Sequence, residues 1–84
     1  MSEQVPTVGR IVHYRLSDPD ATLINVPQRV GNRARMGDTY PALVVRNNGG
    51  SVNLQVFLDG SDSYWATSRT EGEDGGHWSW PPRA

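Results

Sequence analysis

A strict alternation of apolar and polar side chains at residues 52–58 limits the fold more than any other feature of the sequence. The apolar positions are Val52, Leu54, Val56 and Leu58. A period of two places these four side chains on one face of an extended strand. Residues 47–50 read Asn-Asn-Gly-Gly, a strong turn signal because Asn and Gly tolerate positive φ. The pattern predicts a hairpin between this strand and the apolar strand at residues 40–46.

Three further short β-rich runs, at residues 9–16, 64–69 and 77–80, are separated by glycine- and proline-containing segments. In the first run, Val12, Tyr14 and Leu16 alternate with Ile11 and His13. No segment sustains an apolar period of 3.6 residues, so we expect little helix, at most one turn near residues 26–32. The sequence therefore predicts an all-β fold, a small antiparallel five-stranded barrel of SH3-like or OB-like kind with a long first connecting loop.

The length of the chain indicates one domain, residues 1–84, that buries only about two-thirds of its unfolded surface. The chain has no cysteine, which excludes disulfides and thiolate metal sites, and His13 and His77 are too few for a histidine cage. Self-association is the remaining device that stabilises small domains, and we expect a homo-oligomer. The long connection at residues 17–39 is either functional, involved in assembly, or a floppy insertion.

The charge of the chain argues against binding of bulk nucleic acid. The formal net charge is −1, whereas a duplex binder normally carries a basic excess or a basic stripe. All basic residues are arginines, with one loose cluster at Arg29, Arg33 and Arg35. Their planar guanidinium groups suit phosphate and stacking, so recognition of one small anionic ligand remains open.

The chain shows no signal for secretion or membrane insertion. Residues 1–4 lack a basic start followed by an apolar stretch, and no apolar run approaches the roughly 20 residues that span a bilayer. We expect no membrane association and a location in the cytoplasm.

Eight residues are candidates for contact with a ligand. They are His13, Arg46, Asn53, Trp65, Ser68, Arg69, Trp78 and Trp80. The tryptophans offer flat surfaces for base stacking, and Trp78 and Trp80, two apart on a strand, share a face. Arg46 and Arg69 lie next to polar turns within reach of a phosphate, while the amide and hydroxyl groups suit base edges. The alternatives are tryptophans that fill the core, solvated strand ends, and a structural role for His13.

Enzymatic interpretations find little support in the sequence. Residues 59–63 resemble a calcium loop, but Tyr64 and Thr70 stand where an EF-hand has its glycine and its glutamate. There is no lysine, hence no glycine-rich phosphate loop ending in Lys-Ser or Lys-Thr. The acidic turn at residues 71–76 is typical of a solvated loop. We therefore expect no catalytic residue, no metal and no cofactor.

Four segments together resemble a family of small bacteriophage and prophage proteins. They read Val-Gly-Arg-Ile-Val-His-Tyr at residues 8–14, Ala-Leu-Val-Val at 42–45, Val-Asn-Leu-Gln-Val-Phe-Leu-Asp-Gly at 52–60, and Gly-His-Trp-Ser-Trp-Pro at 76–81. The chain is similar to the anti-CBASS nucleotide sponges, small phage oligomers that sequester cyclic dinucleotides without degrading them. The resemblance implies a homotetramer in the host cytoplasm that holds 3′3′-cGAMP or a related cyclic nucleotide between protomers. It does not assign the contact residues.

The predicted function is thus sequestration of a cyclic dinucleotide by a phage immune-evasion protein. A sponge needs no catalytic group, and none is evident. Two alternatives remain open at this point: an SH3-like module that binds a host or phage protein through an aromatic patch, and a minor component of the virion.

Overall fold

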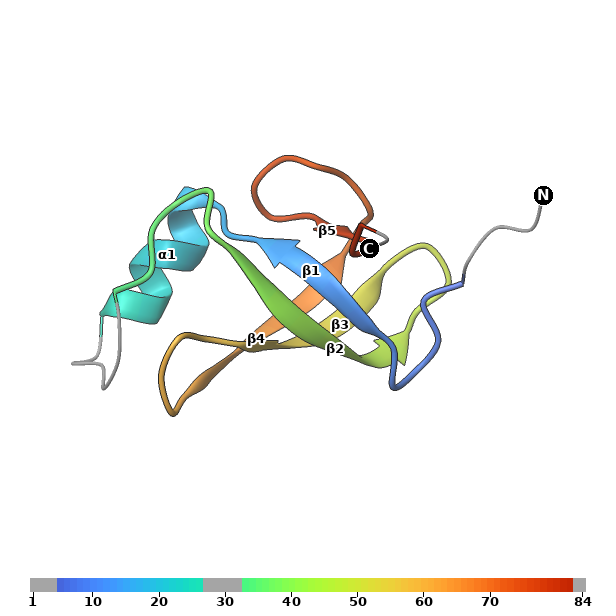
Figure 1. Ribbon diagram of the computed structural model, residues 1–84. Coiled ribbons are helices and arrows are strands. Elements are labelled where there is room, and N and C mark those ends of the chain that lie inside the picture. The colour runs from blue at the N-terminus through green and yellow to red at the C-terminus, as the bar shows by residue number, and fades with distance from the viewer. Residues whose placement is uncertain (1–4, 27–32, 83–84) are drawn as a thin grey trace.

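The computed structural model describes residues 5–26 and 33–82. Within them the chain forms one short helix and a single five-stranded antiparallel sheet (Figure 1). The elements in chain order are β1 (Ile11–Arg15), α1 (Asp18–Asn25), β2 (Thr39–Asn47), β3 (Val52–Phe57), β4 (Ser63–Arg69) and β5 (Trp78–Ser79). The mostly β class and all five predicted strands are confirmed.

The predicted hairpin is the pair formed by β2 and β3. Val44 lies opposite Leu54 in the register of this pair, so inward-facing positions of the two strands meet. The Asn48 N–H donates to the Ser51 carbonyl at 2.8 Å, and Gly49 has a φ of +102°. The turn therefore needs the positive φ that the Asn-Gly signal predicted.

The strand order in the sheet is β4-β3-β2-β1-β5, and the sheet does not close into a barrel. Among the described residues no strand pairing joins β4 to β5, so the predicted barrel is not confirmed as a closed one. The chain just beyond β4 does reach β5. Glu71 forms an isolated parallel bridge with Trp78, and the Trp78 N–H donates to the Thr70 carbonyl at 3.2 Å. The sheet is thus open, and in the described part of the chain one isolated bridge joins the segment after β4 to the edge strand β5.

The helix is where the sequence analysis was wrong. One turn was expected near residues 26–32, of which 27–32 lie outside the described residues, whereas α1 occupies Asp18–Asn25. Ser17 caps the helix: its hydroxyl accepts from the Asp20 N–H, and the Asp20 carboxylate accepts from the Ser17 N–H. This reciprocal capping box, with Pro19 in the first turn, begins a helix that has no long apolar stripe.

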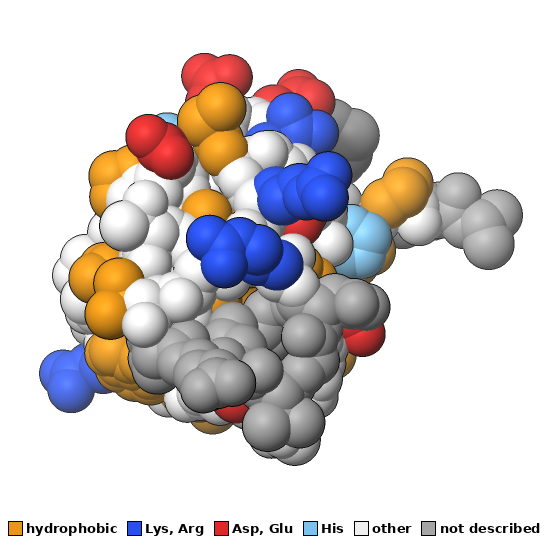
Figure 2. All heavy atoms as spheres, turned by 90° about the vertical axis from the view of Figure 1, so that its left-hand side faces the viewer, with side chains coloured by type: hydrophobic (Ala, Val, Ile, Leu, Met, Phe, Trp, Pro, Cys, Tyr) orange, Lys and Arg blue, Asp and Glu red, His pale blue; other side chains and the backbone are white. Residues whose placement is uncertain are grey.

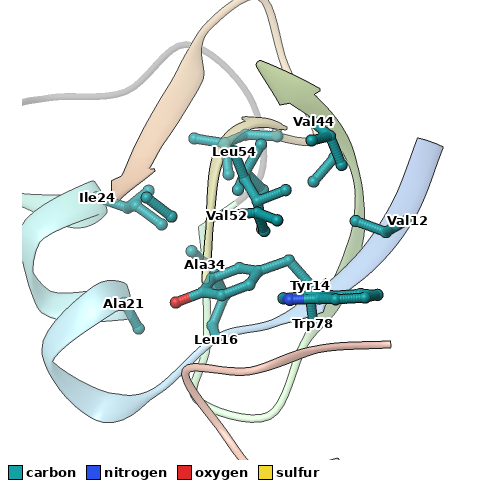
Figure 3. Close-up of a cluster of buried hydrophobic side chains, with 14 residues drawn as sticks. Val12, Tyr14, Leu16, Ala21, Ile24, Ala34, Val44, Val52, Leu54 and Trp78 are labelled. Atoms are coloured by element: carbon teal, nitrogen blue, oxygen red, sulfur yellow. The ribbon is translucent and has the colours of Figure 1, made fainter. Parts of the chain in front are cut away.

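The core lies between the inner face of the sheet and α1. Its side chains come from alternate strand positions, as predicted for β1 and β3, and Figure 3 shows Tyr14 and Trp78 among them. The buried apolar residues are Val12, Tyr14, Leu16, Ala21, Ile24, Ala34, Ala42, Val44, Val52, Leu54, Val56, Leu58, Ala66 and Trp78. Within the described residues, no helix has the length and apolar character needed to cross a bilayer.

The described parts of the long connection, residues 17–26 and 33–39, belong to the folded domain. Ala21, Ile24 and Ala34 are buried, and the Asn25 amide exchanges two hydrogen bonds with the backbone of Ala34, at 2.6 and 3.0 Å. A floppy insertion is therefore the wrong description of these parts.

Candidate functional site

The eight candidate residues do not converge on one place in a single chain. Four of them lie on the outer face of β2, β3 and β4, two on the inner side of the sheet, and two in a groove beside β5. Each place has a different chemistry.

The outer-face group is Arg46, Asn53, Trp65 and Ser68. Arg46 is exposed and lies opposite Asn53, because a bulge in β2 shifts the register after Val44. Trp65 is half exposed on β4, opposite Gln55. This surface offers a guanidinium and an aromatic ring. Neither Arg46 nor Trp65 lines the hollow beside α1, the groove beside β5 or the small hollow near the β2–β3 turn.

Asn53 organises the end of β4. Its side-chain oxygen accepts from the Ser68 N–H at 2.8 Å, from the Thr67 hydroxyl at 3.0 Å and from the Asn48 amide at 3.1 Å. Ser68 has a φ of +58° and sits at the irregularity in the pairing of β3 with β4. The predicted ligand oxygen of Asn53 is thus engaged in holding a β-bulge.

Arg69 turns inward after that bulge. Its Nη2 lies 3.3 Å from Oδ1 of Asp20, and its guanidinium carbon lies 5.7 Å from the centroid of the Tyr14 ring. Its side chain is 29% exposed, whereas that of Asp20 is 3% exposed. The arginine predicted to bind phosphate therefore neutralises a buried carboxylate that belongs to α1.

Asp20 is the centre of a buried polar cluster that the sequence analysis missed. Besides Arg69, it accepts hydrogen bonds from the Tyr14 hydroxyl at 2.5 Å, the Tyr64 hydroxyl at 2.8 Å and the Ser17 N–H at 3.0 Å. Burial alone would raise the pKa of Asp20, but these hydrogen bonds outweigh it and lower that pKa below its usual value. The Ser-x-x-Asp spacing of a capping box was the signal that could have revealed the start of the helix.

The pKa values of the two tyrosines that donate to Asp20 are raised rather than lowered. Burial, then the hydrogen bond to Asp20, raises the pKa of Tyr64 to about 12 and that of Tyr14 further. Both hydroxyls therefore stay protonated and keep donating to the carboxylate at any pH at which proteins normally fold. The cluster ties α1 to β1 and β4.

Trp78 and Trp80 are in contact but differ in exposure, and Trp80 lies just beyond the end of β5. Trp78 is 4% exposed and belongs to the core, which is the alternative that the sequence left open. Trp80 is half-buried against the core, and the two rings meet edge to face with centroids 5.3 Å apart. The Arg10 guanidinium lies over the Trp80 ring at 4.9 Å, a cation–π contact.

A groove of about 670 Å³ lies beside β5 and contains His13 and Trp80. The strands contribute His13, Arg15, Thr39 and Ser79, while the segments on either side of β5 contribute Glu71, Glu73 and Trp80. The register explains the strand residues, because His13 lies opposite Ser79 and Arg15 opposite Thr39. Grooves of this volume are typical of small-molecule sites.

The acidic turn at residues 71–76 forms one wall of the groove and is fixed to β1. The Gly76 N–H donates to the Arg15 carbonyl at 2.8 Å, and the Arg15 N–H donates to the His77 carbonyl at 3.1 Å. A Cβ on Gly75 would lie 2.9 Å from the Leu16 carbonyl oxygen, so the turn approaches the backbone as closely as glycine permits.

The groove mixes charges of both signs. Arg15 has a planar guanidinium group that can bind an anion through two N–H groups. Ser79 and Thr39 supply hydroxyls that can donate or accept hydrogen bonds. Glu71 and Glu73 provide carboxylates that accept from amino groups. In the described part of the chain, no three histidine or acidic side chains lie together as metal ligands would.

A second hollow, of about 400 Å³, adjoins α1 and is lined in part by Arg33, Arg35 and Asp18. Figure 2 shows basic side chains gathered on the end of the molecule that carries α1. Two members of the loose arginine cluster thus line this hollow, whereas Arg29 lies outside the described residues.

Comparison with protein-family models, curated proteins and solved structures found no match. The groove beside β5 and the four sequence segments are therefore the features from which a function can be inferred.

Proposed function

We propose that the protein binds a cyclic dinucleotide in the groove beside β5 and sequesters it without degrading it. One observation carries this proposal: the groove brings two predicted ligand residues, His13 and Trp80, together with Arg15 in a volume suited to a small molecule. The ligand class comes from the resemblance to the anti-CBASS sponges.

Each group in the groove has a role in this proposal. Trp80 presents an aromatic surface for a base, and Arg15 contacts a phosphate through its planar fork. Glu71 and Glu73 accept hydrogen bonds from the amino groups on base edges. A purine with an exocyclic amino group matches this arrangement better than uracil, which has none.

The finer architecture is part of the same proposal. We infer an incomplete barrel of SH3-like or OB-like kind, supported by the five-strand order and by the bridge from Glu71 to Trp78. A homotetramer acting in the host cytoplasm, and the origin of the chain in a phage, rest on the resemblance alone.

Calorimetry with purified protein tests the proposal against 3′3′-cGAMP, cyclic di-GMP, cyclic di-UMP and a linear dinucleotide. We expect tight binding of a purine-containing cyclic species, its intact release after heating, and at least tenfold weaker binding by Arg15→Ala. Arg35→Ala is the matched control, because it removes an exposed arginine from the hollow beside α1 instead. Equal affinity of both variants would place the ligand elsewhere, and no binding across the panel would refute this ligand class.

A protein-interaction module is the second candidate, and one observation favours it. Ile11, Phe57 and Trp65 are large apolar side chains between 44 and 50% exposed, and all three lie on the outer face of the sheet. Recovery of one host or phage protein with the wild type, but not with a Phe57→Lys variant, would support this function over nucleotide binding.

A further inference from the structure

The two edge strands of the sheet differ in how well they are protected against pairing with a further strand. β5 is two residues long and is followed at once by Pro81 and Pro82, which cannot donate backbone hydrogen bonds. β4 forms the other edge with seven residues, and Ser63–Arg69 contains neither proline nor lysine. Natural proteins protect edge strands with prolines, charged residues, bulges or short length, because an open edge pairs with other strands. In β4 the bulge at Ser68 and the inward-pointing Arg69 come only at its end, so residues 63–67 have none of these protections.

Some backbone N–H and C=O groups of β4 are available for hydrogen bonds with a further strand. Among the described residues, no backbone hydrogen bond joins Ser63–Arg69 to any segment other than β3. In an antiparallel ladder about half of the N–H and C=O groups of an edge strand point away from its neighbour. Residues 63–67 therefore present a row of backbone groups at the free edge, up to the bulge at Ser68.

We propose that a second copy of the chain pairs with this edge, antiparallel and about a two-fold axis at Trp65. In this register Trp65 lies opposite the partner's Trp65, Tyr64 opposite the partner's Ala66, and Ser63 opposite the partner's Thr67. The alternation is kept, because Tyr64 and Ala66 face inward while the other three face outward. The two sheets then continue into one another.

The composition of residues 63–67 favours a second copy over an unrelated strand. The segment contains no charged residue, so self-pairing brings no like charges together. It also sets two half-exposed tryptophans side by side, which is a stabilising cross-strand pair. The bulge at Ser68 ends the regular edge, and this limits the pairing to a single short register.

The size of this contact predicts a dimer that dissociates on dilution. Five residues of edge strand and one half-exposed tryptophan bury less than the roughly 800 Å² per partner of a standard interface. The groove beside β5 is at the opposite end of the strand order, so the pairing leaves it open. The proposal therefore does not depend on nucleotide binding.

Sedimentation equilibrium over a wide range of concentrations tests the pairing. We expect the wild type to dimerise reversibly with rising concentration, as one half of the homotetramer that the resemblance implies. Amide exchange at residues 63–67 should slow as the fraction of paired chains rises. Trp65→Lys should raise the dissociation constant at least tenfold, since a lysine on an edge strand opposes pairing. Ile11→Lys is the matched control: it removes a similarly exposed residue from the outer face of β1 and should dimerise like the wild type.

Three results would overturn the pairing. One is a wild type that stays monomeric at millimolar concentration, which would leave the edge to a different protein. Another is equal loss of dimer in Trp65→Lys and Ile11→Lys, which would indicate stacking of the outer faces. The third is an unchanged dimer in Trp65→Lys. If this variant does not fold, Ser63→Lys places the same charge at the same edge with less lost packing and carries the same expectation.

Discussion

The backbone N–H of Ser68 donates to Oδ1 of Asn53 at 2.8 Å, and so holds a serine at a φ of +58°. This bond fixes a β-bulge in β4, where the register with β3 shifts between Val52 and Leu54. One extra residue reverses the alternation, which turns the next side chain, Arg69, toward Asp20. The half-buried Asn53 amide on β3 thereby determines which residue pairs with the buried Asp20 carboxylate on α1.

Substitution of Ser68 tests the strain at this bulge. Ser68→Gly should leave stability unchanged or raise it by up to about 1 kcal/mol, because glycine adopts positive φ without a Cβ penalty. Ser68→Val should lower stability by about 1–3 kcal/mol, since a β-branched residue is strained there. Urea unfolding measures both. Equal stability of the two variants would show that the backbone at this position is not strained.

Arg69 should behave as a structural residue. Arg69→Ala leaves the Asp20 carboxylate buried without its cation, and we expect a loss of about 1–3 kcal/mol, reduced by the partial exposure of the arginine. Arg46→Ala, at an exposed position on β2, should change stability by less than about 0.5 kcal/mol. Thermal or urea unfolding of the two variants separates them. A loss as small for Arg69→Ala as for Arg46→Ala would contradict the importance of the ion pair.

The strands were predictable from the sequence because their signals are local. The alternation of β3 and the Asn-Gly turn each depend on a few neighbouring residues, and both are found as predicted. The helix α1 was missed because it is eight residues long and buries only Asp20, Ala21 and Ile24, too few to produce a helical period. The sequence signal for this helix was the capping box formed by Ser17 and Asp20.

The candidate site was less predictable because it depends on which distant residues meet. Arg46 and Arg69 look alike in the sequence, each next to a polar turn, yet one is exposed and the other is paired with Asp20, 49 positions away. Nothing local distinguishes them, since the bulge that turns Arg69 inward is fixed by Asn53 on another strand. The groove likewise combines β1, β5 and the acidic turn, which only the strand order brings together.

The wall of the groove should be sensitive to one methyl group. Gly75→Ala would place a Cβ 2.9 Å from the Leu16 carbonyl oxygen and 3.0 Å from the Ser17 Cα, and backbone atoms on the partner side have little freedom to move. We expect a loss of about 1–3 kcal/mol together with faster amide exchange at Gly76, whose N–H bonds to Arg15. Gly50→Ala, where a Cβ meets nothing within 4 Å, is the matched control and should be nearly neutral. Two neutral variants would mean that the turn is free to shift.

Asp20 should give the protein a specific sensitivity to acid. The folded-state pKa of this carboxyl is lowered, so its contribution to stability is complete above the unfolded-state value of roughly 4. The contribution is lost as the pH falls through the lower, folded-state pKa, because the unfolded chain binds the proton more readily. Urea unfolding of the wild type from pH 7 to pH 2.5 should therefore show stability falling below about pH 4.

Variants of the cluster assign this acid sensitivity. Tyr64→Phe removes one donor to Asp20, so the folded-state pKa should move back toward its usual value and the loss of stability in acid should become smaller. Asp20→Asn should cost about 2–4 kcal/mol at pH 7 and abolish this part of the acid dependence. Asp18→Asn removes an exposed carboxylate from the first turn of the same helix and leaves the cluster intact. An acid dependence that is the same in the wild type and in Tyr64→Phe, but reduced in Asp18→Asn, would transfer the effect from the buried cluster to the exposed start of α1.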